Sequence, residues 1–211
     1  MSASRLQDPR PSADQRAATT RARIEAVAEA LFRRIGYQKT TVADIARELS
    51  MSPANVYRFF PSKSAINEAI AAHMLDGVMA GAEAIASGPG PAAARLRALL
   101  HHLFESDLRL FIQERRMHDM VEAAMTEHWA VVERFVIGIK ATIARILADG
   151  IADGAFAPID TTNGAEMVKT ATMVWTHPRM LSDCLRQGRS EAELKGQLDV
   201  MVDFLLRALR A

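Results

Sequence analysis

Cysteine and long apolar runs are scarce in this sequence, and both scarcities narrow the class of protein. The single cysteine, Cys184, cannot form a disulfide within the chain, so a reducing compartment is the simplest expectation. No uninterrupted apolar run approaches the roughly 18 residues that a membrane-spanning helix needs, and no hydrophobic segment typical of a secretion signal follows the first charges. We therefore expect a soluble, cytoplasmic protein.

Sequence signatures of catalysis and metal binding are also missing. We find no glycine-rich phosphate loop, no nucleophile elbow and no paired Cys/His zinc signature. Glu114, His118 and Glu122 would share one helical face, but no other predicted helix supplies matching metal ligands. His101-His102 has the wrong spacing for two ligands on one face. We interpret these residues as an ion-paired surface and predict no metal, no cofactor and no enzymatic activity.

Helix-forming residues dominate the composition of the chain. The chain has 211 residues, of which 49% are hydrophobic, so it can bury a substantial core. No long alternating runs of Val, Ile or Thr indicate strands, and we predict an all-α fold. The charge is uneven, because residues 1–63 carry 11 Lys/Arg and 6 Asp/Glu, a balance of +5, although the whole chain has a net charge of +1. This basic end contains the motif described next.

The stretch from Thr41 to Phe60 predicts two short helices joined by a tight turn. Thr41 can cap the first helix, with Asp44 in the reciprocal capping position. Ser52 can cap the second helix, and Pro53 stands at its first position, where a missing N–H costs nothing. This pattern is typical of a DNA-binding helix-turn-helix, whose second helix enters the major groove by its N-terminal end.

The sequence around this motif resembles the N-terminal DNA-binding domain of the TetR (tetracycline-repressor-like) family of bacterial transcription regulators. The likeness covers about residues 20–75 and is carried by the stretch GYQKTTVADIARELSMSPANVYRFFPSKSAINEAI. It implies a three-helix DNA-binding head, a helical body that binds a small-molecule effector, and a homodimer that places two recognition helices in successive major grooves. The function that we expect is a ligand-responsive transcription regulator, namely a repressor that binds a palindromic operator and is released by the effector.

By the same resemblance, eight residues are expected to face double-stranded DNA. Thr41, Tyr57 and Lys63 occupy positions that contact phosphates, and a helix N-terminus beside Lys63 would itself favour a phosphate. The segment that faces bases or phosphates contains Ser52, Pro53, Ala54, Asn55 and Arg58. Asn can pair with adenine, Arg with guanine, and Ala or Pro carbons can contact a thymine methyl. The neighbouring Phe59 and Phe60 are expected to pack inside the head.

The other helices are predicted from apolar periodicity and from clusters of Gly and Pro, which gives about nine helices in all. We expect a flexible arm over residues 1–18, a helix-turn-helix domain over 19–63, and an effector-binding and dimerisation domain over 64–211. The predicted helices outside the motif cover about residues 20–35, 63–87, 92–106, 107–125, 127–149, 161–187 and 191–210. Pro178 should kink the helix over 161–187.

Aromatic and methionine residues of the body are ordinary core candidates. Together they could also line an effector pocket, because methionine adapts to irregular apolar ligands, and the family resemblance places the effector cavity in this region. The pocket candidates are Phe104, Phe111, Met117, Met120, Met125, Trp129, Trp175 and His177. His177 could instead be a structural group that satisfies a backbone carbonyl.

The final predicted helix carries a wide apolar face that includes Leu194, Leu198, Met201, Leu205 and Leu209. In the TetR family the last two helices pair with those of a second subunit, so the resemblance implies a homodimer through these helices; the alternative is that this face only closes the core of its own subunit. Two other functions stay open. One is a helical ligand- or metal-binding enzyme in which the helix-turn-helix is only structural, and the other is a DNA-binding adaptor without an effector.

Overall fold

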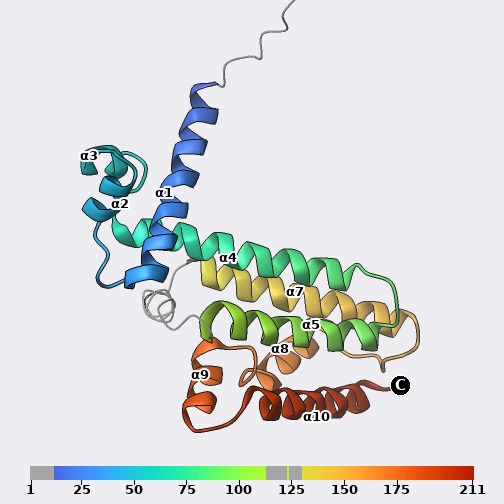
Figure 1. Cartoon of the computed structure of the whole chain (residues 1–211). Helices are drawn as coiled ribbons and strands as arrows, with labels where there is room; N and C mark the ends of the chain where they lie inside the picture. Colours follow the sequence, from blue (N-terminus) through green and yellow to red (C-terminus); the bar gives the residue numbers. More distant parts are fainter. Residues whose placement is uncertain (1–11, 113–122, 124–129) are drawn as a thin grey trace, which may run out of the picture.

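The structure is a computed structural model that describes residues 12–112, 123 and 130–211. Apart from one isolated bridge between Phe156 and Arg210, the regular structure of these residues is helical, which confirms the predicted all-α fold. Nine α-helices and one π-helical turn occur among the described residues. Figure 1 shows a small head at one end of a long helix and a larger, layered body along the rest of that helix.

The head and the body are built from consecutive parts of the chain. The helices of the head are α1 (Ala13–Ile35), α2 (Val42–Glu48) and α3 (Pro53–Tyr57), and the long helix that leaves it is α4 (Lys63–Ala86). The body adds α5 (Ala92–Asp107), η1 (Leu108–Ile112), α7 (Ala130–Ala152), α8 (Thr161–Ala171), α9 (Pro178–Arg186) and α10 (Glu191–Leu209).

Helix α1 begins at Ala13 rather than near Thr20, where we predicted it. The Ser12 hydroxyl accepts a hydrogen bond from the Gln15 backbone N–H at 3.1 Å, and the Gln15 side-chain oxygen accepts one from the Ser12 N–H at 2.7 Å. This reciprocal capping box starts the helix early. Residues 13–18, which we expected in the arm, are therefore helical.

The turn between α2 and α3 is formed by the backbone of α2. The Met51 N–H donates to the Ala46 carbonyl at 2.8 Å, and the Ser50 N–H donates to the Arg47 carbonyl at 3.1 Å. This pair of bonds is a Schellman motif, which requires a left-handed residue after the helix. Ser50 takes that place with φ of 55°, a conformation that costs a residue with a side chain more than it costs glycine.

Helix α4 belongs to two hydrophobic cores. Ile66, Ile70 and Met74 are buried in the head, together with apolar residues of α1, α2 and α3. One turn further on, Val78 and Ala82 are buried in the body. We therefore propose that the predicted domain boundary after residue 63 marks the start of a helix that the two units share. By length and composition α4 could also cross a membrane, but one such helix is weak evidence because core helices pass the same test.

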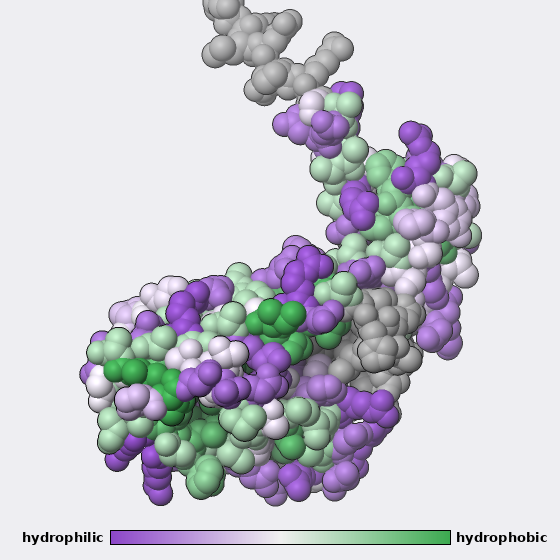
Figure 2. Space-filling model, turned by 180° about the vertical axis from the view of Figure 1, so that it is seen from behind, coloured by the Kyte–Doolittle hydropathy of each residue, from purple (hydrophilic) through white to green (hydrophobic). Residues whose placement is uncertain are grey.

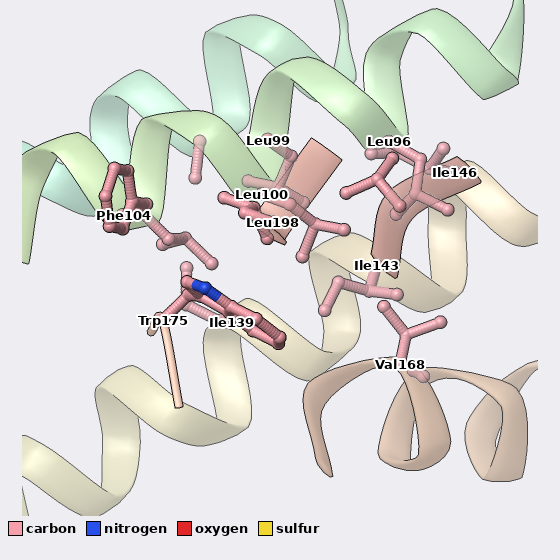
Figure 3. Packing of buried hydrophobic residues seen from close by; sticks show 14 of the residues in the cluster. Leu96, Leu99, Leu100, Phe104, Ile139, Ile143, Ile146, Val168, Trp175 and Leu198 are labelled. Atoms are coloured by element: carbon pink, nitrogen blue, oxygen red, sulfur yellow. The ribbon is translucent and has the colours of Figure 1, made fainter. Parts of the chain in front are cut away.

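The body packs around α5 and α7. Helix α5 contacts α4, α7 and α10, and α7 contacts α4 and α8. Figure 3 shows the resulting core, in which leucines of α5 interdigitate with isoleucines of α7. Its labelled members are Leu96, Leu99, Leu100, Phe104, Ile139, Ile143, Ile146, Val168, Trp175 and Leu198, all of which are buried.

The predicted kinked helix over 161–187 is two helices. Helix α8 ends at Ala171, a turn follows, and Pro178 occupies the first turn of α9. A proline disfavours the helical conformation of the residue before it, and His177 is accordingly extended with φ of −134° and ψ of 116°. Because the missing N–H of proline costs nothing at a helix start, Pro178 begins a helix here instead of bending one.

Candidate DNA interface and effector region

Helix α3 exposes most of its side chains at the tip of the head (Figure 1). Val56 is the exception, because it is fully buried and anchors α3 to the head core. Tyr57 is 50% exposed, and Asn55 is partly buried. The remaining predicted DNA residues of this segment are all exposed, namely Ser52, Pro53, Ala54 and Arg58. The structure therefore gathers these side chains on one accessible surface.

The residues that follow α3 are fixed by contacts inside the head. Phe60 is 1% exposed, and Phe59 packs partly buried against the same core, which confirms that these two aromatics are packing residues. The Arg21 guanidinium of α1 donates to the Phe59 carbonyl at 2.8 Å and lies 4.1 Å above the centre of the Phe60 ring. The sequence did not predict this contact, because its partners are 38 residues apart and leave no local signal.

Thr41 is engaged in capping α2. Its hydroxyl accepts from the Asp44 N–H at 3.1 Å and donates to the Asp44 carboxylate at 2.6 Å. Hydrogen bonds to the carboxylate from the Thr41 hydroxyl and the Thr41 backbone N–H, followed by one from Arg47, hold the pKa of Asp44 below its usual value. The Thr41 hydroxyl proton is therefore already in use, so a phosphate contact by this side chain would require a rearranged cap.

Lys63 is turned toward the protein. Its ammonium donates to the Tyr37 carbonyl at 2.9 Å and to the Gln38 carbonyl at 3.5 Å, and it lies 4.4 Å from the centre of the Tyr37 ring. Burial lowers the pKa of Lys63. The lysine thus fastens the start of α4 to the loop between α1 and α2, and only its third N–H is left for a phosphate. Sequence reasoning missed this structural role, because the partners are 25 and 26 residues away.

Three of the predicted effector residues lie in one part of the body. Phe104 and Trp175 are buried at 1% and 8% exposure, and Figure 3 shows the indole between α5 and α7 with its nitrogen on the edge turned toward α5. His177 follows two residues later as the residue that precedes α9. The other predicted pocket side chains lie outside the part whose side chains are described, namely Phe111, Met117, Met120, Met125 and Trp129.

Buried polar atoms without a hydrogen-bond partner occur in the same region. They include Asp107 Oδ2, Trp175 Nε1 and His177 Nδ1. Burial raises the pKa of Asp107 to about 8, although Lys169 opposes that shift. Burial also lowers the pKa of Lys169, whose ammonium donates to Thr176 Oγ1 at 3.0 Å. Burial and the charge of Lys169 lower the pKa of His177.

His101 and His102 both contact groups of the protein itself. His101 Nε2 lies 2.9 Å from an Asp199 oxygen, and His102 Nε2 lies 2.9 Å from the Val78 carbonyl, so both rings have protein partners. Within the described ranges, no group of three or more His, Cys, Asp or Glu side chains could hold a metal ion. Glu114, His118 and Glu122 lie outside the described residues.

Large apolar side chains are exposed on α8 and α10. Val200 and Phe204 of α10 are 69% and 65% exposed, and Met167 of α8 is 60% exposed. A groove of about 930 Å³ is lined by residues of α10 together with Val174 and Trp175, and a smaller one of about 320 Å³ lies between α8 and the end of α10. Figure 2, which views the molecule from behind, shows strongly hydrophobic patches on the body, whereas the head shows mainly hydrophilic or weakly apolar residues.

Both units of the chain match models of one protein family. The model described as bacterial regulatory proteins of the tetR family matches residues 24–70, and the model described as the tetracyclin repressor-like C-terminal domain matches residues 92–195. The chain belongs to the TetR family. A search of curated proteins found no significant match.

Solved structures of TetR-family proteins share this fold at low sequence identity. A TetR-family regulator from Pectobacterium atrosepticum is 18% identical with a TM-score of 0.72, and the match covers 95% of this chain and 98% of that one. The ketosteroid transcriptional regulator KstR2 of Mycobacterium tuberculosis is 22% identical with a TM-score of 0.54, covering 91% and 95%. The fatty acid degradation regulator FadR from Bacillus halodurans is 12% identical with a TM-score of 0.61, covering 89% and 94%.

Membership of the TetR family establishes the general function. The chain is a DNA-binding transcription regulator with a helix-turn-helix head and a C-terminal domain of the kind that binds ligands in this family. Regulators of the TetR family are generally DNA-binding proteins without enzymatic activity. Dimerisation and small-molecule effectors are typical of the family.

Proposed function

We propose that this TetR-family protein is a cytoplasmic, non-enzymatic repressor that binds a palindromic operator as a homodimer and is released by a small-molecule effector. The observation that carries this proposal is the accessible face of α3, where Ser52, Pro53, Ala54 and Arg58 are exposed around an anchor formed by the buried Val56. A major groove admits one α-helix, and this helix has no other described element covering its tip (Figure 1).

The exposed side chains divide into positioning and reading groups. Asn55 and Arg58 carry amide and guanidinium groups that can pair with adenine and guanine, while Pro53 and Ala54 offer carbons to thymine methyl groups. Tyr57, Ser52 and the remaining N–H of Lys63 are suited to phosphates, as is Thr41 if its cap rearranges. Phosphate contacts position the protein, and base contacts specify the sequence.

The dimer interface that we propose combines α10 with α8. Val200, Phe204 and Met167 are more than half exposed, and aromatic and methionine side chains are enriched at protein interfaces. Helix α9 contributes Met180, which is 38% exposed. The last two predicted helices cover about residues 161–187 and 191–210, so the expected interface includes α8, α9 and α10. Within the first of these ranges, the exposed apolar side chains favour α8 over α9.

Helix α4 is suited to connect an effector in the body with the head. Its first half is buried in the head core and its second half in the body core. Glu83 in the second half accepts hydrogen bonds from Thr142 at 2.6 Å and from Arg145 at 2.5 Å, both on α7. A displacement of α7 would therefore move α4. An effector shifts the population toward release only if it binds the conformation that does not bind DNA more tightly.

The effector is proposed to be mainly apolar. The described body residues near Phe104 and Trp175 are predominantly hydrophobic. Two of the similar structures are a ketosteroid regulator and a fatty acid degradation regulator, and both names refer to molecules with large apolar parts.

Selection of DNA by the purified protein tests the proposal. The full chain is incubated with a pool of random duplexes, bound DNA is recovered over several rounds, and the enriched sequences are read. We expect an enriched site with twofold symmetry and half-sites one helical turn or a multiple of a turn apart, and two chains per duplex by native mass spectrometry. Failure to enrich any sequence, or enrichment of a site without symmetry bound by one chain, would contradict the proposal.

A further inference from the structure

Four polar side chains of the body lie on or beside elements that pack together: Asp107 ends α5, Lys169 belongs to α8, and Trp175 and His177 lie between α8 and α9. We propose that Asp107, Lys169, Trp175 and His177 form the polar end of the effector site and bind the carbonyl or carboxylate oxygen of a mainly apolar molecule. That this ligand acts as the effector rests on the proposed function, whereas binding of the ligand does not depend on DNA recognition. We refer to these four residues as the polar cluster.

The elements that carry the polar cluster are linked through η1 and through the connection between α8 and α9. Asp107 follows Phe104 by three residues in α5, so the two side chains lie on the same side of that helix. Trp175 lies between α5 and α7, with its indole nitrogen on the edge turned toward α5 (Figure 3). The η1 turn begins directly after Asp107 and packs against α9, which begins directly after His177. Lys169 reaches the same connection, because its ammonium donates to the Thr176 carbonyl at 3.2 Å and to its hydroxyl at 3.0 Å.

Three groups of the polar cluster are incompletely satisfied within the protein. The indole N–H of Trp175, one carboxyl oxygen of Asp107 and Nδ1 of His177 are buried and have no hydrogen-bond partner. Buried polar groups in folded proteins are nearly always hydrogen-bonded, and an unpaired one destabilises the fold. Three such groups at one junction therefore indicate a site that a ligand completes. A π-helical turn such as η1 is itself frequent at functional sites.

The hydrogen-bonding roles of these groups select an oxygen acceptor. An indole nitrogen can only donate. The Asp107 carboxyl is mostly protonated at neutral pH, because burial raises its pKa to about 8, so it can donate as well. Lys169 adds a positive charge that acts on both Asp107 and His177. A carbonyl or carboxylate oxygen satisfies these donors, whereas a second cation would be repelled by Lys169.

The rest of the ligand should be apolar. Phe104 is 1% exposed one turn before Asp107, and the ring of Trp175 is 8% exposed. Both belong to the same hydrophobic cluster as the leucines of α5 and the isoleucines of α7. Aromatic walls with a few polar groups at one end are characteristic of small-molecule sites.

Four probes that share one bicyclic aromatic skeleton test the class of ligand. Naphthoate, acetylnaphthalene, naphthylmethylammonium and methylnaphthalene, all substituted at the same ring position, are titrated into the full-length protein by isothermal calorimetry without DNA. We expect naphthoate and acetylnaphthalene to bind at least about tenfold more tightly than the ammonium and hydrocarbon probes, because only the first two complete the hydrogen bonds.

The variant Trp175→Phe removes the indole N–H and keeps an aromatic ring. We expect this variant to bind naphthoate about tenfold more weakly than the wild type, and to bind methylnaphthalene with an affinity within about twofold of the wild type. The matched control is Ser106→Ala, which removes a buried hydroxyl without a partner from the side of α5 that points away from Phe104, and which should leave both affinities unchanged. Thermal unfolding of each variant confirms that it is folded before titration.

Two kinds of result would overturn the proposal. One is equal or tighter binding of naphthylmethylammonium, or no detectable binding of naphthoate and acetylnaphthalene up to their solubility. The other is an equal effect of Trp175→Phe and Ser106→Ala on naphthoate. A protein that binds naphthoate as expected but selects no DNA sequence would refute the proposed function and leave this inference intact.

Discussion

The head and the body of this TetR-family protein arrange their polar groups in opposite ways. In the head, Tyr57 and Arg58 are exposed at the end of α3, a short helix whose only fully buried side chain is Val56, so these polar groups are open to solvent. In the body, Trp175 Nε1 and His177 Nδ1 are buried without hydrogen-bond partners. The first arrangement suits a large charged partner that arrives from outside, and the second suits a small molecule that is enclosed.

The two units also differ in how they are stabilised. The head core is small, and its recognition helix is fixed by the Arg21 and Phe60 contacts. The body core extends over α4, α5, α7, α8 and α10, and an ion pair between Lys195 and Glu105 connects α10 with α5. We therefore expect the head to lose its structure more easily than the body, while α4 transmits changes between them.

The largest effect is expected from Phe60→Ala. This change removes a ring that is 1% exposed and should lower the free energy of unfolding of the head by about 3–5 kcal/mol. Urea denaturation followed by circular dichroism should then show a separate early transition, and DNA binding should be lost. Size-exclusion chromatography should still show the dimer, because the proposed interface lies in the body. Loss of the dimer in this variant would contradict the separation of the two units.

The matched control is Phe104→Ala, which removes a side chain of the same size from the body core. Phe104 is also 1% exposed. This variant should destabilise the body by a similar amount without a separate early transition of the head. An identical unfolding profile for the two variants would show that the chain unfolds as one cooperative unit.

Phe204→Glu should weaken dimerisation next most strongly. Phe204 is 65% exposed in the single chain, and a charge at the centre of an apolar interface should raise the dimer Kd at least about 30-fold, as for a hot-spot residue worth roughly 2 kcal/mol. Analytical ultracentrifugation measures this change. Ala98→Glu, on the exposed side of α5, is the control. A dimer Kd that is unchanged by Phe204→Glu would place the interface elsewhere.

Asp107→Asn should change stability in a way that depends on pH. The pKa of Asp107 is raised from 3.8 to about 8 by burial, so between these values the folded protein retains a proton that the unfolded chain releases. The stability of the wild type therefore decreases as pH rises through this window. Asparagine carries no such proton, so the variant should gain at least about 2 kcal/mol relative to the wild type between pH 4 and pH 8.

Chemical denaturation at these two pH values measures the gain. Asp153→Asn, on an exposed turn, is the matched control. A gain that is the same at both pH values would show that the Asp107 carboxyl is ionised in the folded protein, and the donor role of Asp107 in the polar cluster would then be wrong.

The smallest effect is expected from Ser50→Gly. Ser50 has φ of 55° in the turn between α2 and α3, and glycine should relieve this conformation by roughly 0.5–1 kcal/mol after its own entropy cost. Because the change is in the head, adding it to Phe60→Ala should raise the urea concentration at which the head unfolds. The urea midpoint of the body transition should stay the same. Destabilisation by Ser50→Gly would mean that the serine side chain stabilises the turn.

The head could be predicted from the sequence because its determinants are local. The caps at Thr41 and Ser52, the proline at the start of α3 and the packing of Phe59 and Phe60 all act within a few residues, and all are present in the structure. The same approach failed where a proline had two possible roles: Pro178 was predicted to kink a helix, and it begins one. The early start of α1 was missed because the capping box of Ser12 and Gln15 lies among polar residues without apolar periodicity.

The body site could be predicted only in part, because its determinants are distant in sequence. Phe104, Trp175 and His177 were named from residue type, but Asp107 and Lys169 were not, since only the fold brings α5 and α8 to one junction. The inward position of Lys63 has the same origin, because its partner carbonyls belong to the loop after α1. Burial and long-range pairing, which decide the protonation of these groups, have no local pattern in a single sequence.

Competition gel shifts with the selected operator and a scrambled duplex of equal composition test the central claim most directly, which is that the exposed face of α3 reads bases. We expect Arg58→Ala and Asn55→Ala to weaken operator binding by about 1–3 kcal/mol more than binding to the scrambled duplex, while Tyr57→Ala weakens both equally. An equal loss on both duplexes for every variant would contradict base reading by α3.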